Sequence, residues 1–272
     1  MNSLSRVCIR LDRPLLLASI FAAMGILVPP SLARRPADDA RTIMQRVYDQ
    51  DTSRDASLRA NFQIFDKNHH ASKKDFLYRR LGPAGHRKIL VVFSDPQDIR
   101  GLALLSIAQP GAAPEQYLYT PALHREREVA QQDRSSRFIG TDFTFEDISE
   151  HALDDFSYKM IADSETMENH KVYKLEGTPF GADRSQYKFV YYWIAQDLPL
   201  ILHEEMYDSQ AQEIRTLHAS DLKRVDGIWG ARRLEMATVA EGTRTVLTID
   251  EAKFNTGLDE KLFTPEALEN LP

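Results

Sequence analysis

The sequence predicts a mainly β protein of the α+β class. We expect a curved antiparallel sheet that forms an unclosed half-barrel, with an N-terminal helix and short helices covering its concave face. From residue 57 onward, apolar residues recur at every second position, which is the period of a half-buried strand. About ten such segments follow one another, and their connections are too short for the crossover helices that parallel strands need. A single sheet of that length must curl to bury one face.

The first 33 residues predict export. Three arginines precede an apolar run over residues 15–28, and a proline pair and the small-x-small sequence Ser31-Leu32-Ala33 follow. This order is typical of a signal peptide, here cleaved after Ala33. The run is shorter than the roughly 20 residues of a membrane-spanning helix, although an uncleaved anchor is the alternative. We therefore expect a periplasmic protein without a permanent membrane anchor, in which residues 34–272 form a single domain.

The composition limits the kinds of partner that the protein is expected to bind. The formal net charge is −6, and loss of the first 33 residues would make it more negative. A net acidic chain without a long basic run is not expected to bind nucleic acid, because the phosphate backbone is also negatively charged. The one cysteine, Cys8, lies within the predicted signal peptide, so the core must form without disulfides. We expect a monomer.

The predicted elements begin with a helix over residues 38–51. Ala40, Ile43, Met44 and Val47 form one apolar stripe at helical spacing, and Asp39 is placed to cap its start. Strands are then predicted over residues 57–64, 76–78, 88–93, 102–108, 116–119, 124–128, 156–162, 171–176, 187–195, 200–207, 213–224, 231–239 and 243–254.

Turn and cap residues punctuate these elements. Asp226-Gly227 between two apolar segments predicts a tight hairpin. A helix is predicted over residues 141–150, capped by Thr141 or Asp142. Near the end, Thr264 precedes Pro265 as a cap precedes a first-turn proline, which predicts a short final helix.

Catalytic signatures are missing from the sequence. It holds neither a G-x-x-x-x-G-K-[ST] nor a G-x-G-x-x-G phosphate loop, and no serine lies in G-x-S-x-G. His203-Glu204 lacks a second histidine at the zinc-protease spacing, and His69-His70 lies in a polar loop. We therefore predict no enzyme, no cofactor and no metal. A hydrolase whose site is assembled only in space remains the alternative.

Two segments have a composition that differs from that of an ordinary exposed protein surface. In residues 93–105, Arg100 follows a proline turn between two apolar strands. It either packs on the hairpin stem and pairs with an aspartate, or lies at the rim of a cavity. In residues 117–148, Phe138, Phe143 and Phe145 occur on a long excursion between strands. They form either a lid or a plug that fills one end of the barrel.

These segments resemble the outer-membrane lipoprotein-sorting protein family, the LolA/LolB-like periplasmic carriers, in its uncharacterised branch. The matching pieces are Phe-x-x-Pro…Arg-Gly-x-x-Leu at 93–104, Tyr-Leu-Tyr-x-Pro-Ala-Leu at 117–123, Arg-Ser-x-x-Phe-x-Gly-x-Asp-Phe-x-Phe-Glu-Asp at 134–147, Val-Asp-Gly-Ile-Trp at 225–229 and Phe-Asn-x-Gly-Leu…Phe-Thr-Pro-x-x-Leu at 254–268. The resemblance implies an unclosed barrel with helices over its concave apolar face. It also implies a non-enzymatic carrier of lipid or lipoprotein acyl chains, with an inner-membrane export transporter as a candidate partner.

Residues in strands of high apolar density are the candidate lining of a ligand cavity, although core packing is the simpler explanation for each of them. They are Leu90, Val92, Leu102, Leu104, Leu118, Phe189, Tyr191, Trp193, Leu200 and Leu202. The candidate rim or lid residues are Arg100, Phe138, Phe143 and Phe145. The alternative function is an envelope adaptor, or an accessory protein of an export transporter, that carries no lipid.

Overall fold

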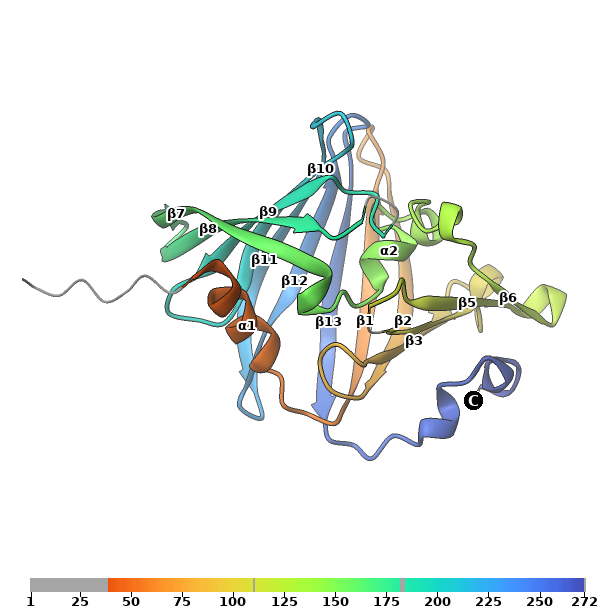
Figure 1. Cartoon of the computed structure of the whole chain (residues 1–272). Coiled ribbons are helices and arrows are strands. Elements are labelled where there is room, and N and C mark those ends of the chain that lie inside the picture. The colour runs from red at the N-terminus through yellow and green to blue at the C-terminus, as the bar shows by residue number, and fades with distance from the viewer. Residues whose placement is uncertain (1–38, 110, 182–183, 272) are drawn as a thin grey trace, which may run out of the picture. The chain divides into compact units, whose positions relative to one another are not determined.

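One antiparallel sheet of thirteen strands carries the described fold (Figure 1). The computed structural model describes residues 39–109, 111–181 and 184–271, so the predicted signal peptide lies outside them. The strands are β1 (Asp55–Phe65), β2 (Ala71–Leu81), β3 (Lys88–Asp95), β4 (Ala103–Ile107), β5 (Glu115–Thr120), β6 (Arg125–Glu128), β7 (Phe156–Met167), β8 (His170–Pro179), β9 (Phe189–Ala195), β10 (Ile201–Tyr207), β11 (Glu213–Val225), β12 (Ile228–Thr238) and β13 (Thr243–Phe254).

The strand order explains why the sheet is an unclosed half-barrel. It runs β6-β5-β4-β3-β2-β1-β13-β12-β11-β10-β9-β8-β7, so each strand pairs with its sequence neighbour except at the β1–β13 junction. Strands β6 and β7 follow one another in the chain but form the two free edges. Residues 129–155, here called the crossing segment, connect these edges over the concave side (Figure 1). The predicted fold class and antiparallel pairing are confirmed.

Helix α1 (Ala40–Asp49) forms where the apolar stripe predicts it. The Asp39 carboxylate accepts a hydrogen bond from the Thr42 amide at 2.7 Å and caps the helix. Ile43 and Met44 are buried against Leu175 on β8 and Ile194 on β9. The helix therefore covers the concave face at the β7–β10 end.

The crossing segment departs from the prediction of a helix over residues 141–150. Helix α2 spans only Phe145–Ile148, and its cap is Thr144 rather than Thr141 or Asp142. Both predicted caps are fully buried instead, because the Asp142 carboxylate accepts hydrogen bonds from threonine hydroxyls on β12 and β13. Side-chain bonding to the sheet thus replaces two turns of helix.

The C-terminal segment covers the opposite, convex face. Thr264 caps a 3₁₀ helix (Pro265–Asn270) as predicted, and its Oγ1 accepts from the Ala267 amide at 3.3 Å. Phe263 and Leu268 are buried against β3 and β4. The sheet is therefore packed on both faces at this end. No helix within the described ranges is long and apolar enough to cross a membrane.

Candidate functional site

Strands β12 and β13 separate at one end of the sheet. They pair only between Arg233↔Thr248 and Thr238↔Thr243. The earlier part of β12 pairs with β11 alone, as far as the hairpin where Val225 faces Ile228. Positive φ values at Asp226 and Gly227 are those of the predicted tight turn. In Figure 1 the lower ends of β12 and β13 diverge.

Two polar side chains bond to backbone groups at this split, one from α1 and one across it from β12 to β13. Gln50, which ends α1, donates to the Trp229 carbonyl at 3.0 Å and accepts from the Trp229 amide at 3.1 Å. Arg232 donates to the Ile249 carbonyl at 3.0 Å and the Asp250 carbonyl at 3.1 Å. These bonds satisfy backbone groups that a continuous ladder would have paired, so the split carries little hydrogen-bonding penalty.

An apolar cavity of about 350 Å³ lies at the split, on the concave side. Its apolar lining comes from five strands: Ala56, Leu58, Ala60, Phe76, Tyr78, Val225, Ile228, Ala231, Leu234, Leu247, Ile249, Ala252 and Phe254. Apolar walls of this kind bind hydrocarbon through burial and dispersion. We call this space the apolar cavity.

Buried ion pairs border the apolar cavity. Arg80 lies 2.9 Å from the Asp51 carboxylate, and Arg87 lies 3.3 Å from Asp51 and 3.4 Å from Glu150. The Arg80 side chain is only 4% exposed, and burial and the neighbouring Arg87 lower its pKa from the ordinary value. Asp51 and Arg87, together with Gln50, also line a second cavity, which adjoins the apolar cavity at these three residues.

The ten candidate lining residues lie elsewhere, since none borders the apolar cavity. Leu102, Leu104 and Leu118 pack in the main core with Phe138, Phe143 and Phe145. Leu90 and Val92 face the convex side beneath the C-terminal segment. Tyr191, Trp193, Leu200 and Leu202 form a cluster with Val172, and Phe189 stacks on Tyr207 with ring centroids 4.6 Å apart.

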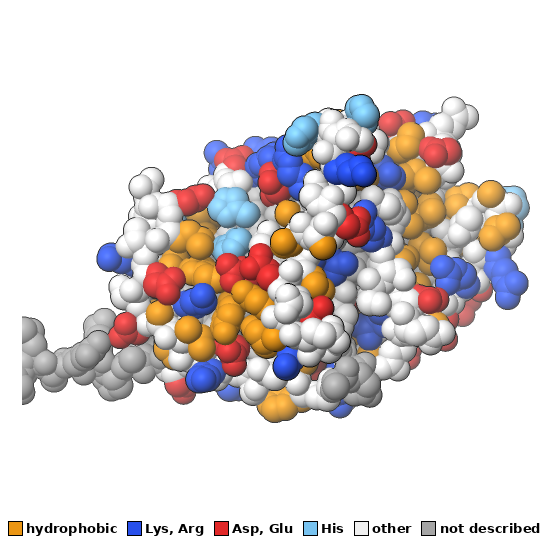
Figure 2. All heavy atoms as spheres, turned by 90° about the horizontal axis from the view of Figure 1, so that it is seen from above, with side chains coloured by type: hydrophobic (Ala, Val, Ile, Leu, Met, Phe, Trp, Pro, Cys, Tyr) orange, Lys and Arg blue, Asp and Glu red, His pale blue; other side chains and the backbone are white. Residues whose placement is uncertain are grey.

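Strand alternation explains these placements. On β3, Ile89, Val91 and Phe93 belong to the main core, so the intervening Leu90 and Val92 must face the other way. Figure 2, the view from above, shows apolar side chains among histidines and carboxylates rather than in one continuous patch. Contact of these ten residues with a ligand stays a prediction.

The candidate rim and lid residues divide into two groups. Arg100 is exposed, donates to the Ser94 carbonyl at 3.0 Å and lies 3.9 Å from Asp95, as the hairpin interpretation expects. The three phenylalanines are buried, and Phe138 contacts Phe145 edge-to-face at 5.4 Å between centroids. They fill one end of the half-barrel, while the apolar cavity remains at the other end.

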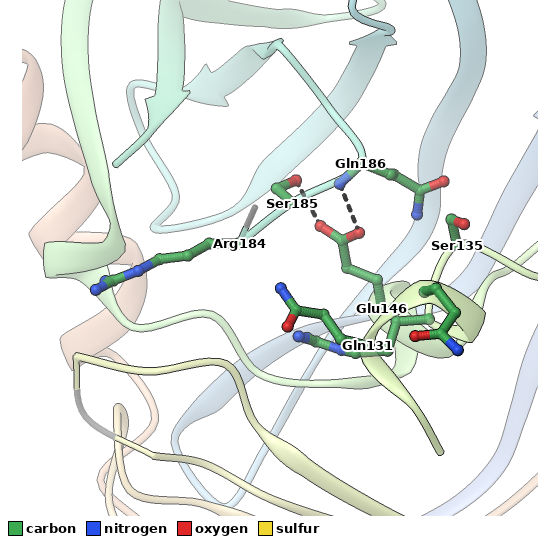
Figure 3. A pocket seen from close by; sticks show the side chains of 8 residues that line it. Gln131, Ser135, Glu146, Arg184, Ser185 and Gln186 are labelled. Atoms are coloured by element: carbon green, nitrogen blue, oxygen red, sulfur yellow. Dashed lines mark hydrogen bonds between the residues drawn. The ribbon is translucent and has the colours of Figure 1, made fainter. Parts of the chain in front are cut away.

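A polar pocket beside α2 anchors the crossing segment (Figure 3). The Glu146 carboxylate accepts from the Ser185 hydroxyl at 2.5 Å and the Gln186 amide at 3.0 Å. Arg184 extends away from Glu146. Arg134 lines the same pocket with its Nε and Nη2 enclosed by protein. The arrangement joins the crossing segment to the start of β9.

The sequence held one signal for the apolar cavity. The Val-Asp-Gly-Ile-Trp motif at 225–229 supplies the hairpin tip that separates from β13. Small residues follow it at Gly230 and Ala231, which leaves space at the split. Among the described residues, no group of three or more histidine, cysteine or acidic side chains is placed to hold a metal.

Comparisons with known proteins identify the family. A family model described as "Uncharacterized protein" matches residues 85–270. A domain named as an outer membrane lipoprotein-sorting protein from Vibrio parahaemolyticus is 25% identical, with a TM-score of 0.81 over 86% of this chain and 100% of that chain. A DUF1329 family protein from Desulfovibrio piger is 23% identical, with a TM-score of 0.81 over 84% of this chain and 97% of that chain.

The same fold occurs in a LolA superfamily protein from Nitrosomonas europaea. It is 18% identical, with a TM-score of 0.68 over 84% of this chain and 98% of that chain. No curated protein sequence matches the chain. The motifs, the unclosed half-barrel and these matches agree: the chain belongs to the family of the model that matches residues 85–270, and it has the fold of the outer membrane lipoprotein-sorting domain and of the LolA superfamily protein.

Proposed function

We propose that the protein is a non-enzymatic periplasmic carrier that binds lipid or lipoprotein acyl chains in the apolar cavity and delivers them to the outer membrane. The observation that carries this proposal is the apolar cavity itself, which lies where β12 leaves β13. Its volume of about 350 Å³ is at the lower end of the range for small-molecule sites. One acyl segment suits this size better than a large ligand.

The physical chemistry of the cavity fits a reversible carrier. Each methylene transferred from water to an apolar wall contributes about 0.8 kcal/mol. An acyl segment of a few carbons therefore binds with useful affinity and is released without breaking a covalent bond. Export from the cytoplasm is supported by the order of charged, apolar and small residues at the start of the sequence.

Gly230 offers a selective way to close the apolar cavity. A Cβ built there meets no heavy atom within 4 Å, and its backbone needs no left-handed conformation. Because Gly230 lines the apolar cavity and its Cβ position is open, we expect Gly230→Phe to place a ring there. Lys253→Phe adds the same ring to the outside of β13, where the native side chain is 64% exposed, and serves as the matched control.

The test is native mass spectrometry of the full chain after export into the periplasm, with lipid extraction of the purified protein. We expect co-purifying acyl lipid with the wild type and Lys253→Phe, and at least tenfold less with Gly230→Phe. Equal lipid on both variants would refute the cavity as the site. Reproducible absence of lipid from the wild type would refute the carrier function.

One observation favours the adaptor alternative. Strand β6 is a free sheet edge of alternating charge, Arg-Glu-Arg-Glu, and the adjacent Leu123 is 70% exposed. Such an edge can accept a strand from a partner. A wild type that carries no lipid but co-purifies with an export transporter through this edge would support the adaptor.

A further inference from the structure

The second cavity has an aromatic wall and one carboxyl. It also measures about 350 Å³ and shares Gln50, Asp51 and Arg87 with the apolar cavity. The aromatic side chains that line it are Tyr48, His151, Phe156, Tyr158 and Tyr192. Glu204 of β10 completes the wall. We call this space the tyrosine pocket.

The sheet register directs Glu204 into the tyrosine pocket. Glu204 pairs with Tyr192 on β9 and with Leu217 on β11, and both neighbours belong to the concave face. In the described part of the chain, the Glu204 carboxyl makes no hydrogen bond or ion pair. Burial raises its pKa to about 8, and the charge of Asp147 adds to this effect.

The other charged groups around the tyrosine pocket are balanced. Arg80 and Arg87 are paired with Asp51 and Glu150 at the border between the cavities. Glu204 is the carboxyl left without a counter-ion on this wall. The titratable and charged groups that face it from the surrounding elements are Tyr48, Asp51, Arg87, Asp147, Glu150, His151, Tyr158 and Tyr192.

We infer that the tyrosine pocket binds the cationic amine of a lipid headgroup, with Glu204 as its counter-ion and the lipid chain in the adjacent apolar cavity. Ring faces attract an ammonium group, and a carboxylate beside them adds a full opposite charge. The two cavities adjoin at Gln50, Asp51 and Arg87, and the inference places the two parts of one molecule on either side of this border. This inference rests on the proposed acyl-binding function and adds the headgroup class.

Binding of an amine then ionises Glu204. With its pKa raised to about 8, we expect the Glu204 carboxyl of the empty pocket to be protonated near neutral pH, and the incoming ammonium to stabilise the carboxylate. One proton passes to the buffer for each cation bound. Glu204→Gln keeps the size and neutrality of the resting side chain, so the variant is expected to fold, but it cannot release this proton.

The test uses three ligands below their micelle concentrations at pH 7, measured by isothermal titration calorimetry on the full mature chain. Dodecylamine carries both chain and amine, dodecanoate carries the chain with a carboxylate, and ethylamine carries the amine alone. We expect the wild type to bind dodecylamine at least tenfold more tightly than dodecanoate. Two buffers of different ionisation enthalpy should report about one proton released.

The Glu204→Gln variant decides the assignment. It should bind both dodecyl ligands with similar affinity and release no proton. A wild type that binds both equally, or a variant that keeps the amine preference, would overturn the inference while leaving the acyl carrier intact. Binding of ethylamine as tightly as dodecylamine would show a site for free amines and would also overturn it. If neither dodecyl ligand binds, the proposed function fails as well.

Discussion

The buried carboxylate of Asp142 should hold the crossing segment to the sheet. It is fully buried and accepts hydrogen bonds from the hydroxyls of Thr238 at 2.7 Å, Thr243 at 2.5 Å and Thr245 at 2.7 Å. Arg137 adds a fourth donor at 3.3 Å. Thr238 lies on β12, and Thr243 and Thr245 lie on β13, so one residue joins the crossing segment to the middle of the sheet.

The cost of Asp142→Ala follows from these contacts. A hydrogen bond to a charged group contributes about 1.5–3 kcal/mol, but the bonds share one acceptor and do not add fully. Removing one partner of a buried charged network typically costs about 3–5 kcal/mol. We expect the free energy of unfolding to fall by about that amount. Asp142→Asn should lose less, because the amide keeps one acceptor oxygen.

Urea unfolding followed by tryptophan fluorescence measures this change, and hydrogen exchange over residues 134–147 locates it. Asp98→Ala is the control, because Asp98 is exposed on the neighbouring hairpin. Its unfolding free energy should stay within about 0.5 kcal/mol of the wild type. A loss below about 1 kcal/mol for Asp142→Ala, with unchanged exchange in the crossing segment, would refute the argument.

Three further changes probe the sheet and its ends. In Gly177→Ala the added Cβ would lie 2.7 Å from the Tyr192 ring. We expect a loss of about 1–3 kcal/mol, measured by thermal unfolding, and an unchanged melting temperature would contradict the packing described. Phe263→Ala should cost about 3–5 kcal/mol in urea unfolding, because the ring is 1% exposed between β3, β4 and the C-terminal segment. Burial of Asp55 opposes its ionisation, but hydrogen bonds from the Thr256 amide and hydroxyl and from the next backbone amide lower its pKa below 3.8. The resulting stability is complete above pH 3.8 and is lost as the pH falls through the lowered pKa. The free energy of unfolding of Asp55→Asn should therefore fall less steeply below pH 4 than that of the wild type. An identical pH dependence in the variant and the wild type would show that the carboxylate contributes nothing.

The fold was predictable wherever one periodic signal dominated. The stripe through Ile43 and Met44 predicts α1, and the turn at Asp226-Gly227 predicts the β11–β12 hairpin. Prediction failed for the helix over residues 141–150, because Asp142 bonds to threonines about a hundred residues away. No local pattern contains that information.

The candidate cavity lining rests on apolar density, and apolar density does not distinguish the two faces of a strand. Residues 89–93 are apolar at every position, since β3 is packed on both sides. The sequence therefore shows no period in these residues that would tell which side chains face the concave side and which face the convex side. The apolar cavity instead depends on where β12 stops pairing with β13, which happens beyond the pair Arg233↔Thr248.

The sequence by itself determined the antiparallel connectivity, the family and every element except the helix predicted over residues 141–150, because these depend on local periodicity, turn residues and ordered motifs. The tertiary structure decided which face of each strand is filled, where the sheet splits and that Glu204 meets three tyrosines from α1, β7 and β9. Those features arise from the curvature of the sheet and from contacts between distant segments. They set the shape and polarity of the two cavities, and they exist only once the chain has folded.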